Sequence, residues 1–292
     1  MISWIVSGKI TGTIGTVAPK GSTAPRRGAG VSEELCAVAI MAKASVAGKV
    51  KTRLVPPLTY KEAAELNTCC LIDVAANIEA AAKQIPIQGF AAYHPLGSEQ
   101  FFDDFLPGSF KLVPPKEPTI GRSLFHAARD LLAMGYGSVC LVNADSPTLP
   151  TQLLVEAVRR LRESGDRIIL GPAADGGYYL IGMKQFHARL FEEIDWSTER
   201  VYQQTIARAG EIGLTVASLR EWYDVDDEET LAVLARELRL VPASEDGYYG
   251  GYAAPATSAF LERLAANRGV ARLFDRSDPR PIPPRAGWSE LG

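Results

Sequence analysis

The sequence predicts an α/β fold in which a mostly parallel sheet carries helices on both faces. Short apolar runs alternate with helical patterns along most of the chain, and the run 139–142 is apolar throughout and bounded by turn signals, as a buried strand would be. Strands separated by helices form parallel sheets with both faces covered. The 292 residues, 47% of them hydrophobic, are enough for a buried core. Right-handed crossovers then bring the loops that follow the strands to one edge, where such sheets bind ligands.

The individual elements carry their own start and stop signals. Thr59 and Glu62 frame a capping-box sequence that opens a long Ala-rich helix. Gly135 and Gly137 follow the end of a later helix. A Gly- and Tyr-rich stretch over 171–183 surrounds a carboxylate and is assigned no element. The expected strands are 35–41, 88–93, 139–142, 167–170 and 214–218, and the expected helices are 60–83, 120–134, 151–163, 198–208, 227–238 and 257–267.

Changes in composition divide the chain into three parts. Residues 1–32 are rich in Gly, Thr, Ser and Pro, and we expect them to form a flexible tail. Residues 33–241 form the α/β domain. Residues 242–292 hold a Gly/Tyr loop, one helix and a proline-containing end, which we interpret as a C-terminal helical extension and loose tail. We expect this helix to pack on its own domain, with packing on a partner subunit, and hence a homodimer, as the alternative.

Bulk properties exclude several classes of protein. A formal net charge of −3 and a pI near 5.8 are unlike those of a general nucleic-acid binder. No apolar stretch is long enough to span a bilayer. The apolar first residues are too few for us to expect a signal peptide, and no basic region precedes them. The four cysteines lack zinc-finger or redox-motif spacing, so we interpret them as reduced thiols and expect the protein in the cytoplasm.

A basic loop directly follows the first apolar run. Within residues 41–54 the chain places three lysines, one arginine and a glycine: Lys43, Gly48, Lys49, Lys51 and Arg53. Lysine and arginine supply charge and donors to phosphate oxygens, and the glycine would let the backbone approach a ligand closely. At the carboxyl edge of a parallel sheet such a loop indicates a polyanion site. Taken alone, it is equally compatible with a solvated basic loop.

A carboxylate follows the 139–142 strand at once, in the sequence Asn143-Ala144-Asp145-Ser146-Pro147. Asp145 is therefore expected at the carboxyl end of a central strand, near the basic loop. A carboxylate there suits a divalent cation held against phosphate oxygens, because magnesium usually takes one or two protein carboxylates. The alternative is a structural aspartate in an Asx turn or helix N-cap before Pro147.

A second carboxylate, Asp175, is followed by Gly176 and Gly177 and then by two tyrosines. The two glycines allow the backbone to approach a ligand closely, and the tyrosines offer stacking faces for a base or a sugar. The alternative is a tight turn that leads into an edge strand. Such a turn would need the glycines but not the whole string of residues.

The third acidic motif is Asp224-Val225-Asp226-Asp227, directly before a helical pattern. We expect Asp227 to be the N-cap of that helix. We expect the side chains of Asp224 and Asp226 to point to opposite faces if the backbone is extended, so that only one of them faces the site and reaches a metal, and we favour Asp226. The alternative is an acidic helix start that suits the helix dipole. The chain also has three histidines without ligand spacing, which we interpret as ordinary surface or core residues: His94, His126 and His187.

Together these motifs resemble the family of radical-SAM/selenodomain-associated transferases, which is glycosyltransferase-like. The resemblance covers roughly residues 35–240 and is carried by the sequences 48–54, Asp145-Ser146-Pro147, 175–182 and Asp224-Val225-Asp226. That family is similar to the wider GT-A superfamily of nucleotide-diphospho-sugar transferases, which includes the guanylyltransferases for molybdenum cofactor and 2-phospho-lactate. The resemblance therefore implies a GT-A-like sheet with a Rossmann-like nucleotide-binding half.

The resemblance also implies roles for single residues. The nucleotide phosphates would be bound by the basic loop, with Mg²⁺ or Mn²⁺ held by Asp145 and, as the second ligand, Asp226. Asp175 would lie beside the acceptor or the sugar. The candidate catalytic residues are then Lys49, Arg53 and Asp175, and the candidate nucleotide-binding residues are Lys43, Gly48, Lys51, Asn143, Gly176 and Gly177.

Three functions remain open at this point. The first, which the family favours, is glycosyl transfer from a nucleotide-sugar to a small acceptor. The second is nucleotidyl transfer, in which a nucleoside triphosphate is joined to a phosphorylated acceptor and pyrophosphate is released. The third is a non-catalytic nucleotide-binding protein, which departures from the family motifs motivate: for example, Asn143 stands where the family usually has glycine.

Overall fold

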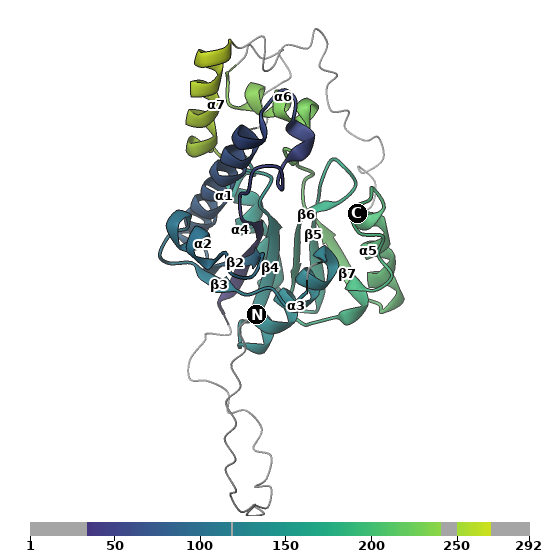
Figure 1. Cartoon of the computed structure of the whole chain (residues 1–292). Helices are drawn as coiled ribbons and strands as arrows, with labels where there is room; N and C mark the ends of the chain where they lie inside the picture. Colours follow the sequence, from purple (N-terminus) through teal and green to yellow (C-terminus); the bar gives the residue numbers. More distant parts are fainter. Residues whose placement is uncertain (1–33, 118, 241–249, 270–292) are drawn as a thin grey trace, which may run out of the picture.

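A computed structural model describes residues 34–117, 119–240 and 250–269 of the chain. They form a seven-stranded sheet in the order β3-β2-β1-β4-β6-β5-β7 (Figure 1). The strands are β1 (Cys36–Lys43), β2 (Ile87–His94), β3 (Lys111–Val113), β4 (Ser138–Asn143), β5 (Arg167–Pro172), β6 (Tyr178–Met183) and β7 (Thr215–Ser218). The helices are α1 (Tyr60–Ala82), α2 (Glu99–Phe105), α3 (Ile120–Ala133), α4 (Thr151–Arg162), α5 (Val201–Glu211), α6 (Glu228–Glu237) and α7 (Pro255–Arg268), with short 3₁₀ turns η1 (Thr52–Leu54) and η2 (Ala188–Phe191).

The sheet is parallel except for one strand. β1 pairs in parallel with both β2 and β4, and β5 pairs in parallel with β7. β6 lies between β4 and β5 and runs antiparallel to both. The mostly parallel α/β fold predicted from the sequence is therefore confirmed, and the loops after β1, β4 and β5 lie at one edge.

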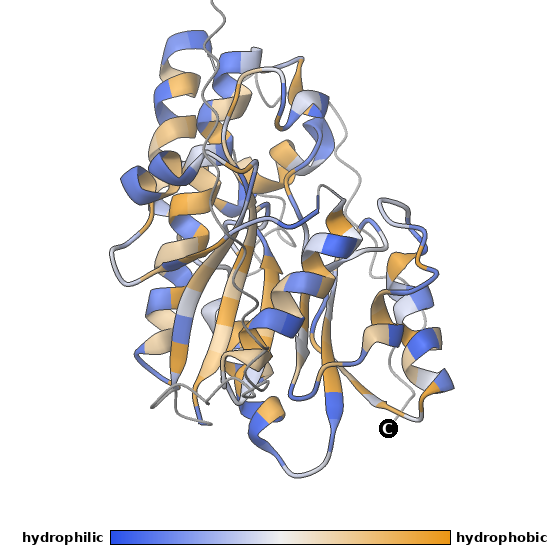
Figure 2. Ribbon diagram, turned by 60° about the horizontal axis from the view of Figure 1, so that its bottom comes forward, coloured by the Kyte–Doolittle hydropathy of each residue, from blue (hydrophilic) through white to orange (hydrophobic). Residues whose placement is uncertain are grey.

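Two apolar layers cover the two faces of the sheet. Along β1, the side chains of Val38 and Ile40 belong to the layer that packs under α1 and α4, whereas Ala37 and Ala39 belong to the layer under α3 and α5. Neighbouring residues of a strand point to opposite faces, so a strand buried on both faces must be apolar throughout. Figure 2 shows the resulting continuous hydrophobic colouring of the central strands.

The caps predicted from the sequence are present. The side chain of Thr59 accepts a hydrogen bond from the backbone N–H of Glu62, whose carboxylate accepts one from the N–H of Thr59, so both donors at the start of α1 are satisfied. Asp227 caps α6 in the same reciprocal way with Thr230. These caps fix where α1 and α6 begin, and thereby the positions of the loops that precede them.

Three elements were missing from the sequence prediction. The stretch 171–183, to which no element was assigned, contains β6, and β6 lies inside the sheet rather than at its edge. Tyr179, Leu180 and Ile181 are almost fully buried, which the glycines and tyrosines around them conceal in the sequence. The short β3 and α2 were also not predicted. All four cysteines are free.

The C-terminal helix α7 packs on α1 of its own chain, as expected. Asp73, buried on α1, accepts hydrogen bonds from the backbone N–H groups of Ala256 (3.0 Å) and Thr257 (2.7 Å), so it caps the first turn of α7. The predicted tail 1–32 and the predicted loose end after 269 lie outside the described residues, and the domain boundaries stay predictions. Among the described residues, no helix is both long and apolar enough to cross a membrane.

Candidate functional site

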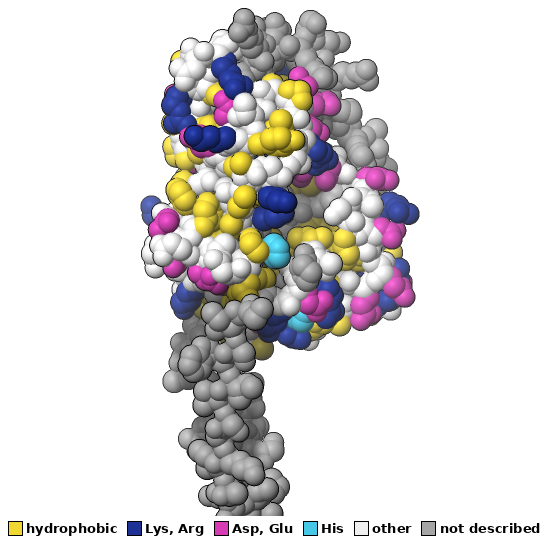
Figure 3. Space-filling view, in the orientation of Figure 1, with side chains coloured by type: hydrophobic (Ala, Val, Ile, Leu, Met, Phe, Trp, Pro, Cys, Tyr) yellow, Lys and Arg dark blue, Asp and Glu magenta, His cyan; other side chains and the backbone are white. Residues whose placement is uncertain are grey.

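A cleft of about 670 Å³ lies at the carboxyl edge of β4 and β5. Its walls come from the three acidic motifs, from Arg53 of the basic loop and from the segment 196–199 between η2 and α5. The space-filling view shows a hollow between the half of the molecule that carries α2 and the half that carries α5 (Figure 3). The cleft therefore collects motifs that are far apart in the sequence.

Lys51 and Asp145 form the innermost polar contact of this edge. The Nζ of Lys51 lies 2.5 Å from Oδ1 of Asp145 and donates a second hydrogen bond to the backbone oxygen of Val225 (2.8 Å). The Lys51 side chain is 2% exposed, so its charge is almost fully removed from water. Burial alone lowers the pKa of Lys51, but the charges of Asp145 and Asp226 outweigh it and the pKa lies above its usual value.

Arg53 makes the corresponding contact on the outer side. Its Nη2 lies 2.6 Å from Oδ2 of Asp226, and the arginine side chain is 66% exposed. The backbone N–H of Val225, directly before Asp226, donates to the backbone oxygen of Asp145 (2.8 Å). The basic loop, the loop after β4 and the segment before α6 are thus tied together by one set of hydrogen bonds.

Both Asp224 and Asp226 line the cleft, so the expectation that only one of them would face the site was wrong. Side chains two residues apart in an extended segment point to the same face, and Val225 between them is fully buried on the other. Burial, followed by the charges of Asp175, Asp226 and Asp145, raises the pKa of Asp224 to about 7. Burial, followed by the charge of Asp145, also raises the pKa of Asp226.

The charges of the cleft fit a divalent cation. Five carboxylates line it, those of Asp145, Asp175, Glu199, Asp224 and Asp226. Only two of them are paired with a cation, Asp145 with Lys51 and Asp226 with Arg53, so acidic groups are in excess. Within the described residues, no group of three His, Cys, Asp or Glu side chains forms a ready-made metal cage. An open site with one or two carboxylates is the arrangement that magnesium uses when substrate phosphates supply the remaining ligands.

The turn around Asp175 is held by its two glycines. Oδ1 of Asp175 accepts a hydrogen bond from the backbone N–H of Gly177 (2.8 Å), which closes an Asx turn. Gly176 has a φ of +92°, and a Cβ there would collide with the backbone of Glu199. Its carbonyl accepts a hydrogen bond from the N–H of Tyr202 (3.0 Å). The turn that carries Asp175 therefore packs directly against the segment 196–199, which also lines the cleft.

The remaining residues of the basic loop lie farther out. Gly48 has a φ of +76° and nothing near its Cα, so it provides a left-handed turn in open space. Lys51 is itself left-handed, with a φ of 46°. Lys43 and Lys49 are exposed, and the Nζ of Lys43 donates to the backbone oxygen of Lys49 (3.1 Å). Asn143, at the end of β4, lines the cleft.

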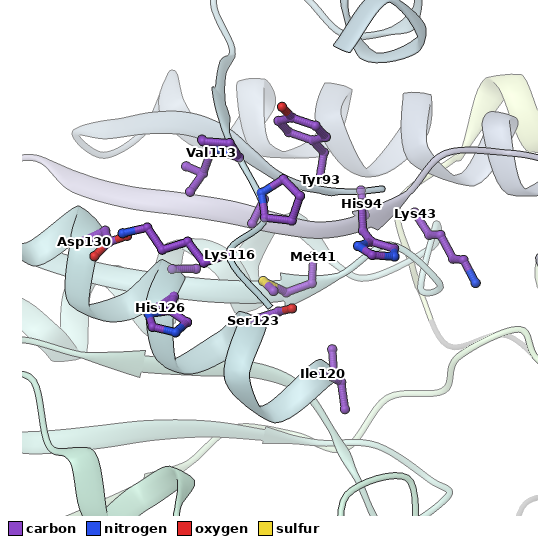
Figure 4. A pocket seen from close by; sticks show the side chains of 15 residues that line it. Met41, Lys43, Tyr93, His94, Val113, Lys116, Ile120, Ser123, His126 and Asp130 are labelled. Atoms are coloured by element: carbon purple, nitrogen blue, oxygen red, sulfur yellow. The ribbon is translucent and has the colours of Figure 1, made fainter. Parts of the chain in front are cut away.

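A second cavity, of about 230 Å³, adjoins the cleft (Figure 4). Met41 and Ile120 line both spaces. The second cavity lies among the ends of β1, β2 and β3 and the helix α3, and Lys43 lines it, so it connects to the basic loop. Among the described residues, the Nδ1 atoms of His94 and His126 are buried there without a hydrogen-bond partner.

Sequence reasoning missed part of both spaces. Trp196 and Glu199 lie in an irregular segment that carries no motif, so nothing in the sequence marked them. His94 was interpreted as an ordinary residue because the histidines have no ligand spacing. Its position at the carboxyl end of β2, level with Lys43 on β1, was the signal that could have found it.

Comparisons with known proteins identify the fold. Residues 77–198, less than half of the chain, match a family described as uncharacterized proteins conserved in bacteria (DUF2064). The structure is similar to the crystal structure of a protein from Desulfovibrio desulfuricans G20 that is described, provisionally, as a nucleotide-diphospho-sugar transferase. The two chains are 28% identical with a TM-score of 0.68, and the match covers 81% of this chain and 96% of that one. The fold is thus that of a GT-A-like transferase; association with radical-SAM/selenodomain proteins stays a prediction.

Two further solved structures share parts of the fold. CMP:2-keto-3-deoxy-manno-octonic acid synthetase, complexed with CTP, is 11% identical with a TM-score of 0.46, over 70% of this chain and 99% of that one. Glucosyl-3-phosphoglycerate synthase from Mycobacterium tuberculosis, in complex with Mn²⁺, uridine diphosphate and glucosyl-3-phosphoglycerate, is 11% identical with a TM-score of 0.43, over 72% of this chain and 82% of that one. A comparison with curated proteins gives no match.

Proposed function

We propose that the protein is a metal-dependent transferase that moves a glycosyl group from a nucleotide-sugar to a small acceptor. The observation that carries this proposal is the contact of Lys51 with Asp145 at the edge of a large cleft, because it joins a basic loop suited to phosphates to a carboxylate suited to a divalent cation. The similarity to the Desulfovibrio protein supports a transferase that uses a nucleotide-diphospho-sugar. Because one fold can carry many activities, the proposed reaction is argued from the residues of the cleft and not from the fold alone.

The metal would be Mg²⁺ or Mn²⁺, held by Asp145 and Asp226. Asp145 contacts Lys51 and Asp226 contacts Arg53, so both carboxylates lie within reach of a ligand bound to the basic loop. A bound divalent cation would supply charge that stabilises the diphosphate as it leaves. The side chains of the chain itself hold the diphosphate in place, because the guanidinium of Arg53 can bind phosphate oxygens in a bidentate manner.

The nucleoside would occupy the second cavity. Lys43 lines that cavity and contacts Lys49 of the loop, so a nucleotide whose phosphates lie on the loop would place its base there. The unpartnered Nδ1 of His94 and the hydroxyl of Ser123 are polar groups that a base could meet in a site otherwise rich in apolar side chains (Figure 4). The sugar would then extend through the shared wall at Met41 into the larger cleft.

Nucleotidyl transfer is the second candidate. It is favoured by the number of cations in one short loop: Lys43, Lys49, Lys51 and Arg53 together suit a triphosphate. The two reactions differ in their products, because only nucleotidyl transfer releases pyrophosphate from a nucleoside triphosphate.

The four free cysteines fit a reducing compartment, and we propose a cytoplasmic location on that basis.

A thermal-shift panel tests the proposed function. Nucleoside triphosphates and nucleotide-sugars would be tested with and without Mg²⁺ or Mn²⁺, with Asp145→Asn as the control variant. We expect metal-dependent stabilisation of the native protein by one nucleotide-sugar, and not by its parent triphosphate. Selective stabilisation by a triphosphate, with pyrophosphate release, would establish nucleotidyl transfer instead. Stabilisation without any turnover of the donor would indicate a non-catalytic nucleotide-binding protein.

A further inference from the structure

We infer that the acceptor of this transferase carries no phosphate or other anionic group, and that it offers hydroxyl or amino groups to an acidic wall of the cleft. This inference rests on the proposed function and names the substrate class that the same site accepts. It concerns the part of the cleft that the turn at Asp175 and the segment 196–199 line together. The contact between Gly176 and the backbone of Glu199 shows that these two walls are adjacent.

The ionisable side chains in this part of the cleft are all acidic. Asp175, Glu199 and Asp224 line it, and among the described residues no Lys, Arg or His lies within salt-bridge distance of these three carboxylates. Arg53 is the one basic side chain among the described cleft residues, and it is paired with Asp226 on the side of the basic loop. A phosphorylated acceptor would therefore meet uncompensated carboxylates, whereas hydroxyl and ammonium groups would meet hydrogen-bond acceptors.

An aromatic side chain completes this part of the cleft. Trp196 is partly buried and lines the cleft together with the carboxylates of the three acidic motifs. Its indole contacts Gly121 of α3, where a Cβ would collide with Nε1. The absence of a side chain at Gly121 thus lets the indole approach the start of the helix closely. An apolar ring face beside several carboxylates is suited to a ring that carries hydroxyl groups.

This assignment separates the two reactions. Nucleotidyl transfer to a phosphomonoester needs cations around the acceptor, and the cleft has its cations on the donor side. In glycosyl transfer, the O–H or N–H bond of the acceptor breaks and a bond from its O or N to the anomeric carbon forms. The bond from that carbon to the diphosphate oxygen breaks, and its electron pair leaves with the diphosphate. The proton passes to a carboxylate of the acidic wall, of which Asp175 and Glu199 are the exposed ones and Asp224 is partly buried.

Saturation-transfer NMR on the full chain tests the inference with three probes that share one ring: glucose, glucosamine and glucose 6-phosphate. Mn²⁺ and inorganic pyrophosphate are present throughout to occupy the basic loop, so that the phosphate probe cannot bind there. We expect signals for glucose and glucosamine and none for glucose 6-phosphate. In Glu199→Lys, glucose 6-phosphate should gain a signal and that of glucosamine should fall severalfold. Asp103→Lys, on the exposed face of α2, is the matched control and should change nothing.

Binding of glucose 6-phosphate to the wild type as strong as that of glucose would overturn the inference. So would the absence of binding by all three probes, or an unchanged preference in Glu199→Lys. These outcomes do not decide whether the proposed function is right, because that function is tested by stabilisation with a nucleotide-sugar, which is measured without any acceptor. If the nucleotide-sugar stabilises the protein while the phosphate probe is preferred, the acceptor class is wrong and the transferase proposal stands.

Discussion

The ammonium of Lys51 lies 2.5 Å from the carboxylate of Asp145, although the two residues are 94 positions apart in the chain. The loop after β1 and the loop after β4 meet because β1 and β4 are neighbouring parallel strands. The same ammonium donates to the carbonyl of Val225, so it also holds the segment that carries Asp226. Lys51 is thus an internal cation placed between the two carboxylates that we propose as metal ligands.

Replacing Lys51 with Met should raise the affinity for Mn²⁺ in the absence of nucleotide. Lys51 compensates Asp145, so a metal ion must compete with it, and removing the ammonium leaves the carboxylate free for the ion. We expect severalfold tighter binding in titration calorimetry. Lys49→Met removes an exposed charge from the same loop and is the control. Equal or weaker Mn²⁺ binding by Lys51→Met would show that Lys51 does not compete for the metal site.

Replacing Arg53 with Ala should weaken binding of a nucleoside diphosphate about tenfold, the size of one charge-assisted hydrogen bond. Binding of the free nucleoside should stay unchanged, because Arg53 lines the cleft and not the second cavity. The ratio of the two dissociation constants, measured by calorimetry in the wild type and the variant, is the test. Equal weakening of both ligands would mean that Arg53 supports the structure of the loop rather than the phosphates.

Asp224 makes the stability of the metal-free protein depend on pH. Burial and the neighbouring carboxylates raise the pKa of Asp224 to about 7, so the folded state favours its protonated form. The resulting stabilisation is present below the unfolded-state pKa of about 3.9 and is lost as the pH rises through 7. Asn carries no charge, so the free energy of unfolding of Asp224→Asn relative to wild type should increase between pH 5 and pH 8, by a few kcal/mol at most.

Urea denaturation in EDTA at the two pH values measures this difference. Adding Mn²⁺ should reduce it, because a bound cation favours the ionised carboxylates. A difference between Asp224→Asn and wild type that is the same at both pH values would contradict the assigned cause.

The two left-handed glycines should respond differently to Ala. Both Gly48 and Gly176 have positive φ, and this alone costs an L-residue about 1 kcal/mol. At Gly48 the added Cβ meets nothing, whereas at Gly176 it collides with the backbone of Glu199. We therefore expect Gly176→Ala to lower the free energy of unfolding clearly more than Gly48→Ala in matched denaturant titrations. Equal losses in the two variants would mean that the turn at Asp175 is not packed as described.

The sequence allowed most of the fold to be predicted because its strong signals are local. The capping sequence at Thr59 and the apolar run of β4 each report their own structure without help from distant residues. β3 has only three residues, too few for a periodic pattern, and α2 has seven residues and no side-chain cap at Ser98. β6 was not predicted because its burial depends on its place in the sheet between β5, the preceding strand, and β4, which is separated from it in the sequence by α4 and β5.

The candidate site was predictable where motifs follow strands. Asp145 and the basic loop could be expected near one another because both follow strands of one parallel sheet. The positions of Trp196 and Glu199 depend on the packing of an irregular segment against Gly176, which no local pattern encodes. Asp224 was expected to point away from the site, which was wrong because side chains two residues apart in an extended segment point to the same face.

The most direct measurement compares wild type with Asp145→Asn by titration calorimetry, using UDP, GDP, CDP and ADP with and without Mn²⁺. For at least one of these diphosphates, we predict binding to the wild type that Mn²⁺ tightens by about tenfold or more, equivalent to about 1.4 kcal/mol. In Asp145→Asn the Mn²⁺ effect should disappear while the protein stays folded, with a lower melting temperature because the buried ammonium of Lys51 loses its charged partner. An undiminished Mn²⁺ effect in Asp145→Asn would contradict the proposal that this carboxylate holds the metal against the nucleotide phosphates.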